Sequence, residues 1–525
     1  MDERFIDTLK KRKVGLALLL LQLAASVVAI CIMANLHILS YGKVAIVICT
    51  EAVLLGIIGY LHGGKKEKLS MIAKGLSVIM ILGNVLVSFY CAEARGAMGK
   101  VTGNTVQIDR VSIYVLKDSK ASTINDLADG VFGLLTIDST DKIEEAVKTV
   151  KEHVNKEIKT AEYSDAVSVA KALYEKKADA IIMNEAYTSV IEEDSTYNNF
   201  EKDTRVLTTY EHSTTLKNQN AISDVTDKSF NVFLSGNDTF GSIKTKSHCD
   251  VNMIVTVNPK TKQILLTSTP RDYYVPTTVS GGVRDKLTHA GNSGIECSTG
   301  TIENLYKIKV NYYVKVNFTG FKEIVNALGG ITVHSDYDFT SEQGPAFVKG
   351  DNKMNGKEAL AFARERHAFK DQDLQRNKDQ QYVVKGIVDK ACSSAILTKF
   401  TDVLKSIEGS IVTNMPYDDI ASFVQMQLND NAKWDIISVG LTGTDAYRTS
   451  FSIPHSRKYV MLPDENQVKN AKELMEKIMA GEKFTDDQAK AFIKATPAPK
   501  ATATPKASTT PKAATTPKAA NQKSK

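Results

Sequence analysis

The segment AFARERHAFKDQDLQRNKDQQ brings together side chains suited to binding anions. The candidate site residues in this segment are Arg364, Arg366, Asp373, Arg376 and Gln380. Arg376 and Gln380 are four residues apart and therefore share one face of a helix, with Asp373 near its first turn. Arg364 and Arg366 point the same way only if the chain is extended there, which predicts that the preceding helix KEALAFA ends before them.

Three further charged residues lie at the ends of predicted strands. Asp238 follows FNVFLSG, Asp250 begins DVNMIVTV, and Arg271 follows ILLTSTP. Guanidinium groups bind phosphate oxygens through paired hydrogen bonds and keep their charge at any physiological pH. Carboxylates at strand ends can hold a hard cation such as Mg²⁺, which bridges phosphates. The four arginines and two carboxylates therefore suit a phosphate ester with a divalent cation.

The alternative interpretation of any one arginine is an ordinary surface salt bridge. We expect that role for three neighbouring charged residues, which are Lys370, Asp371 and Lys378. Sequence spacing alone does not show that the arginines converge in space.

Residues 220–482 are predicted to position these side chains in an α/β unit with a central mixed sheet covered by helices. NMIVTV and QILLTSTP, separated by NPKTK, predict a hairpin that is apolar on both faces and therefore central in the sheet. NYYVKVNFTGFKEIVNALGG predicts a strand followed by a helix that ends at Gly-Gly, before the strand ITVHSDYDF. RNKDQQYVVKGIVDKACSSAI predicts a longer helix.

A smaller α/β unit is predicted over residues 112–212. VSIYVL and VFGLLTI predict strands, and DKIEEAVKTVKEHVN carries apolar residues at the three- and four-residue spacing of an amphipathic helix. The alternation of β and α segments favours a small accessory domain. Its order is loosely similar to a lobe of extracellular solute-binding proteins, and a structural spacer is the alternative.

The N-terminal region is predicted to cross a membrane three times, over residues 14–36, 44–61 and 69–92. Basic residues precede the first span and form HGGKKEK between the second and third, so the positive-inside rule places both in the cytoplasm. Everything after the third span is then expected outside. Glu51 and Lys74 lie within the spans, either as a functional pair or relay or as helix contacts and a snorkelling lysine.

Six cysteines are present. Cys31, Cys49 and Cys91 lie in the predicted spans, and Cys392 lies on a helical pattern. Cys249 and Cys297 are candidates for a disulfide, because the predicted exterior location is oxidising.

The net charge of +6 is carried by the C-terminal tail, because residues 496–525 hold six lysines and no acidic residue. This distribution disfavours a nucleic-acid-binding face. The stretch 495–525, rich in Pro, Thr, Ala and Lys, is predicted to be disordered. Its single sign of charge favours association with an anionic surface polymer, and the alternative is a solubilising tail.

Several common catalytic signatures are missing. The sequence has no GxSxG and no HExxH, and GDNKMNGKE lacks the spacing and the hydroxyl residue of a phosphate-binding P-loop. These absences disfavour a serine hydrolase, a zinc peptidase and a kinase.

Four long motifs in order resemble the LytR-CpsA-Psr family over about residues 220–480. They are SHCDVNMIVTVNPKTKQILLTSTPRDYYVP, DKLTHAG, VNFTGFKEIVNALGGITV and MNGKEALAFARERHAFKDQDLQRNKDQQ. Three spans followed by an accessory domain also look like the capsule-associated branch of that family.

The resemblance implies a phosphotransferase that moves a glycopolymer, such as capsule or teichoic acid, from a polyprenyl-pyrophosphate carrier to a peptidoglycan hydroxyl. It implies that Asp238 and Asp250 associate with Mg²⁺ or Mn²⁺. Our own hypothesis is that either Asp238 or Asp250 takes the acceptor proton as the general base, a role that competes with metal ligation. It also implies an apolar lipid pocket, which TDVLKSIEGSIV is a candidate to line.

The resemblance further implies that the pyrophosphate is bound by the arginines, with two supporting polar residues. These site residues are Arg271, Arg364, Arg366, Arg376, Asp373 and Gln380. Many members carry Arg two residues before the second aspartate, where this chain has His248, so a phosphate-binding role for His248 is not implied.

Three other functions stay open on the sequence. A polyprenyl-pyrophosphate hydrolase would use the same arginines, with water in place of the sugar. A non-enzymatic envelope sensor or regulator would use the accessory domain as a receptor. A cytoplasmic DNA-binding regulator is disfavoured by the predicted topology.

Overall fold

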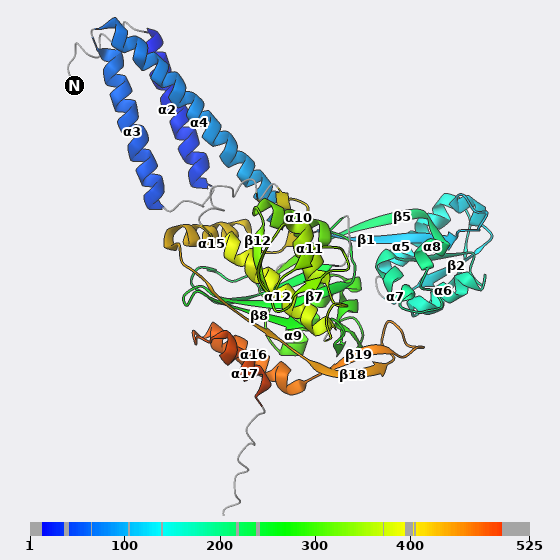
Figure 1. The fold of residues 1–525 in the computed structure, drawn as a ribbon. Helices are drawn as coiled ribbons and strands as arrows, with labels where there is room; N and C mark the ends of the chain where they lie inside the picture. Colours follow the sequence, from blue (N-terminus) through cyan, green and yellow to red (C-terminus); the bar gives the residue numbers. More distant parts are fainter. Residues whose placement is uncertain are drawn as a thin grey trace, which may run out of the picture.

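A computed structural model of the chain describes residues 13–35, 41–64, 66–102, 106–137, 140–216, 220–237, 242–370, 372–393, 403 and 406–495. It contains an N-terminal bundle of three helices, a smaller α/β domain and a larger α/β domain (Figure 1). The predicted tail beyond residue 495 lies outside the described residues.

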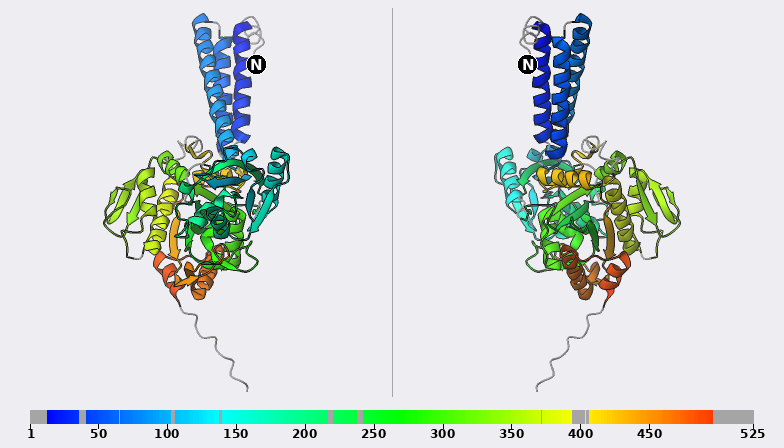
Figure 2. Two further views of the ribbon diagram at one scale, coloured as in Figure 1. Left: turned by 90° about the vertical axis from the view of Figure 1, so that its right-hand side faces the viewer. Right: turned by 90° about the vertical axis from the view of Figure 1, so that its left-hand side faces the viewer.

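The bundle consists of α2 (Lys13–Asn35), α3 (Tyr41–Gly63) and α4 (Glu67–Thr102). Each helix is long and apolar enough to cross a membrane. The Ser26 hydroxyl donates to Glu51 Oε2 at 2.7 Å, and Asn84 Nδ2 donates to Ser26 Oγ at 2.9 Å, so one polar cluster joins the three helices. This arrangement favours the helix-contact interpretation of Glu51. Beyond the span, α4 continues to Thr102 and contacts the larger domain (Figure 2).

The smaller domain, here called the accessory domain, has a five-stranded sheet in the order β3-β2-β4-β1-β5. Its strands are β1 (Val106–Leu116), β2 (Val131–Leu135), β3 (Lys159–Tyr163), β4 (Ala180–Asn184) and β5 (Thr204–Thr215). Its helices are η1 (Ile124–Leu127), α5 (Thr140–Val154), α6 (Ala166–Tyr174), η2 (Glu185–Tyr187), α7 (Thr188–Glu192) and α8 (Phe200–Asp203). The helix α5 forms as predicted and buries Ile143, Ala146 and Val150 at three- and four-residue spacing against one face of the sheet.

The larger domain is built on a mixed six-stranded sheet in the order β16-β11-β6-β7-β8-β17. These strands are β6 (Phe230–Asn237), β7 (Cys249–Asn258), β8 (Gln263–Thr269), β11 (Tyr312–Asn317), β16 (Ile411–Thr413) and β17 (Asp435–Gly440). The predicted hairpin is confirmed as β7 and β8, which pair antiparallel from Asn252 opposite Thr269 to Asn258 opposite Gln263. β6 flanks β7, so the hairpin lies inside the sheet as its apolar faces predict.

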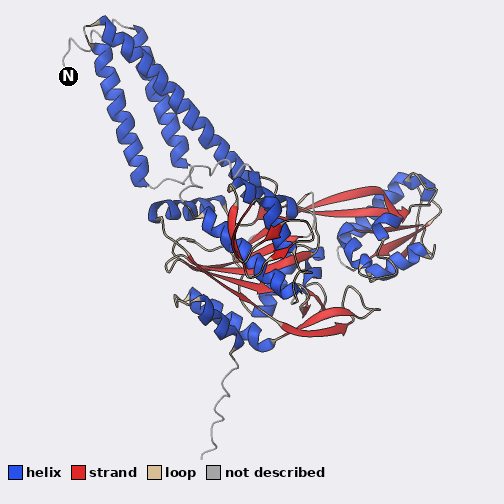
Figure 3. Ribbon diagram, in the orientation of Figure 1, coloured by secondary structure: helices blue, strands red, loops and turns tan. Residues whose placement is uncertain are grey.

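Helices cover both faces of this sheet (Figure 3). They are α9 (Ile295–Tyr306), α16 (Glu465–Met479) and α17 (Asp486–Lys494) on one face, and α12 (Gln372–Ala391) and α15 (Tyr417–Asp430) on the other. α10 (Phe318–Ala327) and α11 (Gly356–Arg364) pack beside α12. The predicted fold class, a central mixed sheet covered by helices, is therefore confirmed.

Short elements complete the larger domain. They are β9 (Tyr274–Pro276), β10 (Arg284–Lys286), η3 (Leu287–Ser293), β12 (Ile331–Ser335), β13 (Phe339–Thr340), β14 (Ala346–Phe347), β15 (Gly350–Met354), β18 (Gly443–Arg448) and β19 (Lys458–Pro463). The predicted strand ITVHS forms as β12, but it pairs with β15 in a separate two-stranded sheet. That sheet covers the core of α10, α11 and α12.

Candidate active site

One cavity of about 320 Å³ brings most of the predicted site together. Its polar lining includes Asp250, Arg271, Arg364, Arg366, Arg376 and Gln380. The side chains come from the start of β7, the loop after β8, the end of α11 and the first turns of α12. Asp373 does not line the cavity, but it contacts two arginines that do. Asp238 lies outside the described residues.

The end of α11 aims Arg364 and Arg366 at the cavity. Asn355 starts this helix by accepting hydrogen bonds from Lys357 N and Glu358 N, in a capping box with Glu358. The helix ends at Arg364, and Glu365 is extended with φ −64° and ψ 135°. The predicted end before Arg364 is therefore wrong by one residue, yet the extended residue still lets both arginines face the same space.

Arg271 and Asp250 form an ion pair in the site. Arg271 Nη1 lies 3.1 Å from each carboxylate oxygen of Asp250, and Thr288 Oγ1 donates to Asp250 Oδ1 at 3.3 Å. Burial opposes ionisation, but the guanidinium groups of Arg271 and Arg376 hold the pKa of Asp250 below its usual range. Asp250 is therefore ionised at neutral pH.

Arg376 keeps hydrogen-bonding capacity that the protein does not use. Its Nη2 lies 3.1 Å from Asp373 Oδ1, but within the described chain neither Nη2 nor Nε makes a hydrogen bond. Burial and the neighbouring Arg271 lower the pKa of Arg376, so two buried guanidinium groups repel each other here. Buried donors that lack a partner are costly, which indicates that a ligand supplies the acceptors.

Arg364 and Gln380 are held by contacts with the surrounding wall. The Arg364 guanidinium stacks on the Phe318 ring, 4.2 Å from its centroid. Gln380 Nε2 donates to the carbonyl of Ala363 at 3.3 Å, which ties α12 to the end of α11. The sequence interpretation missed Phe318, although it stands inside the motif VNFTGF.

Apolar side chains form another part of the lining of the same cavity. Its lining includes Leu234, Val316, Phe318, Phe321, Leu360, Val383 and Val384. The candidate segment TDVLKSIEGSIV contributes none of its described residues to this lining. The strands β6 and β11 and the helices α10, α11 and α12 form the apolar wall instead.

Asn237 and Asp250 offer oxygen ligands for the expected metal ion. Asn237 Nδ2 donates to Ser247 O at 3.0 Å and to His248 O at 2.8 Å, which orients Oδ1 away from these carbonyls. Asn237 Oδ1 is buried and, among the described residues, has no hydrogen-bond donor. Both residues line the cavity, and amide and carboxylate oxygens are ligands that Mg²⁺ accepts. The described residues therefore fit a divalent cation.

His248 contacts the accessory domain and a second histidine. Its Nε2 lies 3.2 Å from Ser189 Oγ of the accessory domain, and its ring stacks on His289 with centroids 5.1 Å apart. Burial and the neighbouring charge of His289 lower the pKa of His248 to about 4. It is neutral at physiological pH and does not line the arginine cavity.

The expected disulfide between Cys249 and Cys297 is not formed. Cys249 Sγ lies at the start of β7, 2.9 Å from Ser235 Oγ, whereas Cys297 is buried in α9. Each thiol packs in its own environment, and burial raises the pKa of both. Lys378 forms the expected salt bridge, 2.6 Å from Asp336.

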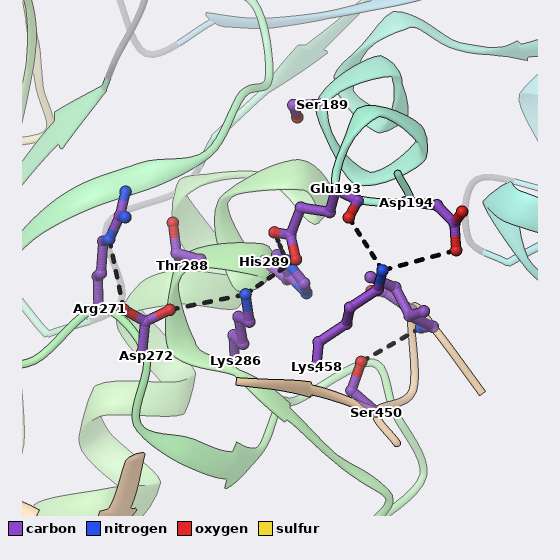
Figure 4. Close-up of polar contacts among 12 residues, drawn as sticks. Ser189, Glu193, Asp194, Arg271, Asp272, Lys286, Thr288, His289, Ser450 and Lys458 are labelled. Atoms are coloured by element: carbon purple, nitrogen blue, oxygen red, sulfur yellow. Dashed lines mark hydrogen bonds and ion pairs between the residues drawn. The ribbon is translucent and has the colours of Figure 1, made fainter. Parts of the chain in front are cut away.

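A charged cluster beside the site joins the accessory domain to the larger domain (Figure 4). Glu193, just after α7, accepts a hydrogen bond from Lys286 Nζ at 2.8 Å and lies 2.9 Å from His289 Nε2. His289 Nδ1 lies 2.7 Å from Asp285. Despite burial, these two carboxylates raise the pKa of His289 to about 9, so the charged ring donates from both nitrogens.

The same cluster has spacing that a metal ion could use, since ligand atoms of Glu193, His248 and His289 lie within 4.8 Å of one another. The Lys286 ammonium against Glu193 and the charged His289 already neutralise the carboxylates. Two resident cations favour an ion-pair network over a metal site. Sequence spacing missed this cluster because His289 and Glu193 are 96 residues apart in the chain.

Comparison with known sequences identifies one family over most of the larger domain. A sequence profile described as the LytR_cpsA_psr family matches residues 195–477, more than half of the chain. A second profile, described as DNA polymerase processivity factor, matches residues 65–183. That second range covers less than a quarter of the chain and begins beside α4, a candidate membrane span, so it carries no assignment.

Two curated relatives carry the name polyisoprenyl-teichoic acid–peptidoglycan teichoic acid transferase TagU. The protein of Bacillus licheniformis is 38% identical over 192 residues, which are 36% of this chain and 61% of the relative. The protein of Bacillus subtilis strain 168 is 38% identical over 176 residues, 33% of this chain and 57% of the relative. The chain thus spans about three fifths of the length of these relatives.

Solved structures also resemble part of the chain. The crystal structure of B. subtilis TagV matches with a TM-score of 0.42 and 27% identity, covering 49% of this chain and 99% of that one. A structure described as TagT bound to LI-WTA matches with a TM-score of 0.39 and 27% identity, covering 48% and 91%.

Proposed function

Because the chain belongs to the LytR-CpsA-Psr family, we propose that it is a membrane-anchored phosphotransferase that attaches a lipid-linked glycopolymer to peptidoglycan. The observation that carries this proposal is one cavity lined by four arginines, an ionised aspartate and a set of apolar side chains. The names of the curated relatives, which are teichoic acid transferases, support the same reaction.

The cavity suits both chemical halves of a polyprenyl-pyrophosphate donor. Arg271 and Arg376 present buried N–H groups to the pyrophosphate, and Arg364 and Arg366 add charge from the end of α11. The polyprenyl chain packs against apolar side chains such as Phe321, Leu360 and Val383. Asp373 and Gln380 act by holding Arg376 and the end of α11 in place.

The proposed reaction exchanges the phosphoanhydride bond of the donor for a phosphate ester bond to the acceptor. A peptidoglycan hydroxyl oxygen attacks the phosphorus that carries the glycopolymer, and the bond from that phosphorus to the bridging oxygen breaks. Polyprenyl phosphate leaves with the bridging oxygen, and the hydroxyl proton passes to a base. The products are a polymer–peptidoglycan phosphodiester and polyprenyl phosphate. The guanidinium groups stabilise the charge on the equatorial and leaving oxygens.

We assign the cation to Asn237 and Asp250, with the sequence neighbour Asp238 as a further candidate ligand. A bound Mg²⁺ or Mn²⁺ would neutralise charge on the pyrophosphate. Asp250 is also a candidate general base, together with Asp238. The Arg271 ion pair lowers the basicity of Asp250, which favours its use as a metal ligand.

The proposed location is a cell membrane, with the N-terminus in the cytoplasm and both α/β domains outside. The three apolar helices support membrane anchoring, and the basic flanks of the first spans support this orientation. The lipid-linked donor lies in the same membrane. The names of the relatives favour teichoic acid over capsule polysaccharide as the polymer.

The test uses the full chain in lipid nanodiscs with labelled polyprenyl-pyrophosphate-linked polymer and isolated peptidoglycan. We expect the label to become wall-bound, with release of one polyprenyl phosphate per polymer and a requirement for Mg²⁺ or Mn²⁺. Release of a polymer phosphate monoester without wall-bound label would identify a hydrolase instead. No change in the donor at all would support a non-enzymatic sensor.

A further inference from the structure

A second cavity lies between the accessory domain and the active site. It has a volume of about 480 Å³, within the range of small-molecule binding sites. The accessory domain supplies one wall, which includes Glu185, Thr188 and Ser189, and the larger domain supplies another, which includes Ser247 and His248. We call this space the interdomain cavity.

The two cavities meet at the reacting centre. Among the described residues, their linings share only Asp250 and Arg271. This ion pair therefore separates a cavity with a large apolar surface from one whose lining residues, apart from Ala186, all carry polar side-chain atoms. Hydroxyl, amide and imidazole groups of this kind bind sugar hydroxyls and acetamido groups.

Resting on the proposed phosphotransfer, we propose that the interdomain cavity binds the acceptor, a hydroxyl-bearing N-acetylhexosamine chain, and that the accessory domain forms half of this subsite. The direction of attack supports the assignment. Phosphoryl transfer requires the entering and leaving oxygens roughly in line across the phosphorus. The leaving polyprenyl phosphate belongs to the apolar cavity, so the entering hydroxyl comes from the cavity that meets it at Asp250 and Arg271.

The walls of the interdomain cavity are held together by ion pairs. Glu193 contacts Lys286 and His289, and Lys458 Nζ donates to the carbonyl of Glu193 at 3.0 Å (Figure 4). On another side, Asp109 of β1 forms a buried ion pair with Lys246. A fixed wall is needed to hold an acceptor hydroxyl in line with the phosphorus.

The backbone also attaches the accessory domain beside the cavity. Ile108 N of β1 donates to the carbonyl of Lys244 at 2.9 Å, and Ile108 forms a parallel bridge with Thr245. Ile453 of the larger domain is buried in the hydrophobic core of the accessory domain. The two domains are thus joined by main chain, ion pairs and apolar packing at once.

The test measures binding of a soluble peptidoglycan tetrasaccharide of alternating N-acetylhexosamines to the full chain in nanodiscs by calorimetry. Ser189→Trp fills the cavity from the accessory side, and Glu185→Gln keeps the size of the side chain while removing its charge. Ser122→Trp is the matched control, because Ser122 is exposed on the same domain and does not line the cavity. We expect Ser189→Trp to raise the Kd for the tetrasaccharide at least tenfold, Glu185→Gln to raise it less, and Ser122→Trp to leave it unchanged.

Donor binding is measured in parallel, with polyprenyl pyrophosphate as the probe. Unchanged donor affinity in Ser189→Trp supports the assignment and shows that the variant is folded. Equal tetrasaccharide affinity in Ser189→Trp and wild type would overturn it, as would binding of a lipid-free polymer fragment, rather than the tetrasaccharide, in this cavity. A wild-type protein that binds both probes but transfers nothing would overturn the proposed function and leave the subsite standing.

Discussion

Two charged clusters lie next to each other in this protein and differ in how completely their members are paired. The interdomain cluster consists of Glu193, Asp285, Lys286 and His289. In it, Glu193 accepts from Lys286 and His289, and His289 bonds to carboxylates through both ring nitrogens. The site cluster consists of Asp250, Arg271, Asp373 and Arg376. In it, Arg271 Nε and Arg376 Nε and Nη2 make no hydrogen bond within the described chain. The first cluster is complete without a ligand, and the second is not.

The difference separates a structural interface from a binding site. A fully paired network fixes the positions of two domains, because every buried charge has a partner. A cluster with unused donors and two like charges side by side is held open by its surroundings and gains its partners when an anion binds. Charge content alone does not distinguish them, since both clusters mix acids and bases.

The largest expected effect comes from Arg271, which belongs to the site cluster and touches both cavities. Arg271→Ala is expected to lower the rate of polymer transfer by about 10²–10³-fold, because it removes a donor aimed at the developing charge. The assay is transfer of labelled lipid-linked polymer to peptidoglycan. Arg284→Ala, at an exposed position in β10, is the control. A near-normal rate in Arg271→Ala would contradict the assignment of the site.

Arg376 provides a sharper comparison within one helix. Arg376→Ala is expected to weaken binding of polyprenyl pyrophosphate by about 10- to 100-fold, since hydrogen bonds to charged groups contribute about 1.5–3 kcal/mol. Its thermal midpoint is expected to change little, because the loss also relieves repulsion from Arg271. Lys378→Ala, two residues along α12, removes a salt bridge to Asp336 and should leave donor binding intact. Equal donor affinities for the two variants would count against the pyrophosphate role.

Substitution of Glu193, in the interdomain cluster, should lower stability and leave donor binding unchanged. Glu193→Gln leaves Lys286 and the charged His289 without their carboxylate, so we expect the protein to lose about 1–3 kcal/mol of stability while donor affinity is unchanged. Thermal unfolding and donor binding are measured on the same sample, with the exposed Glu144→Gln as the control. If Glu193→Gln lowered donor affinity without lowering stability, the proposed difference between the two clusters would be contradicted.

The smallest expected effect is a pH dependence of the interdomain cluster. His289 titrates near pH 9 in the folded protein against about 6.5 when unfolded, so its stabilisation is complete below about pH 6.5 and lost as the pH rises through 9. Asp285 and Glu193, which face it, have lowered pKa values and stay ionised across this window, and His248 stacks on it as a neutral ring. The thermal midpoint should fall by a few degrees between pH 6.5 and 9. His289→Gln should remove this dependence.

The sequence predicted those parts of the molecule that depend on local pattern. The membrane-length helices, the apolar hairpin of β7 and β8, and the α/β class each follow from periodicity over a few residues. The arginines of α11 and α12 converge with Arg271 because strand and helix ends that carry them meet at one cavity. Before the structure, only the family resemblance implied that these arginines form one site.

What the sequence did not predict depends on contacts between distant segments. Glu193 and Lys286 carry no local signal that would pair them across 93 residues. The predicted exterior location made a Cys249–Cys297 bond reasonable, but packing keeps each thiol in a separate buried environment. The expectation that TDVLKSIEGSIV lines an apolar pocket did not identify the apolar wall of the arginine cavity, because apolar residues are common and only the fold shows which of them border a cavity.

The helix α4 has a consequence for where the arginine cavity lies relative to a membrane. It is 36 residues long, or about 54 Å at 1.5 Å per residue, whereas the hydrocarbon layer is about 30 Å thick. A single unbroken helix therefore leaves the bilayer and ends against β16 and α15 of the larger domain. It acts as a spacer that fixes the height of the arginine cavity above the lipid.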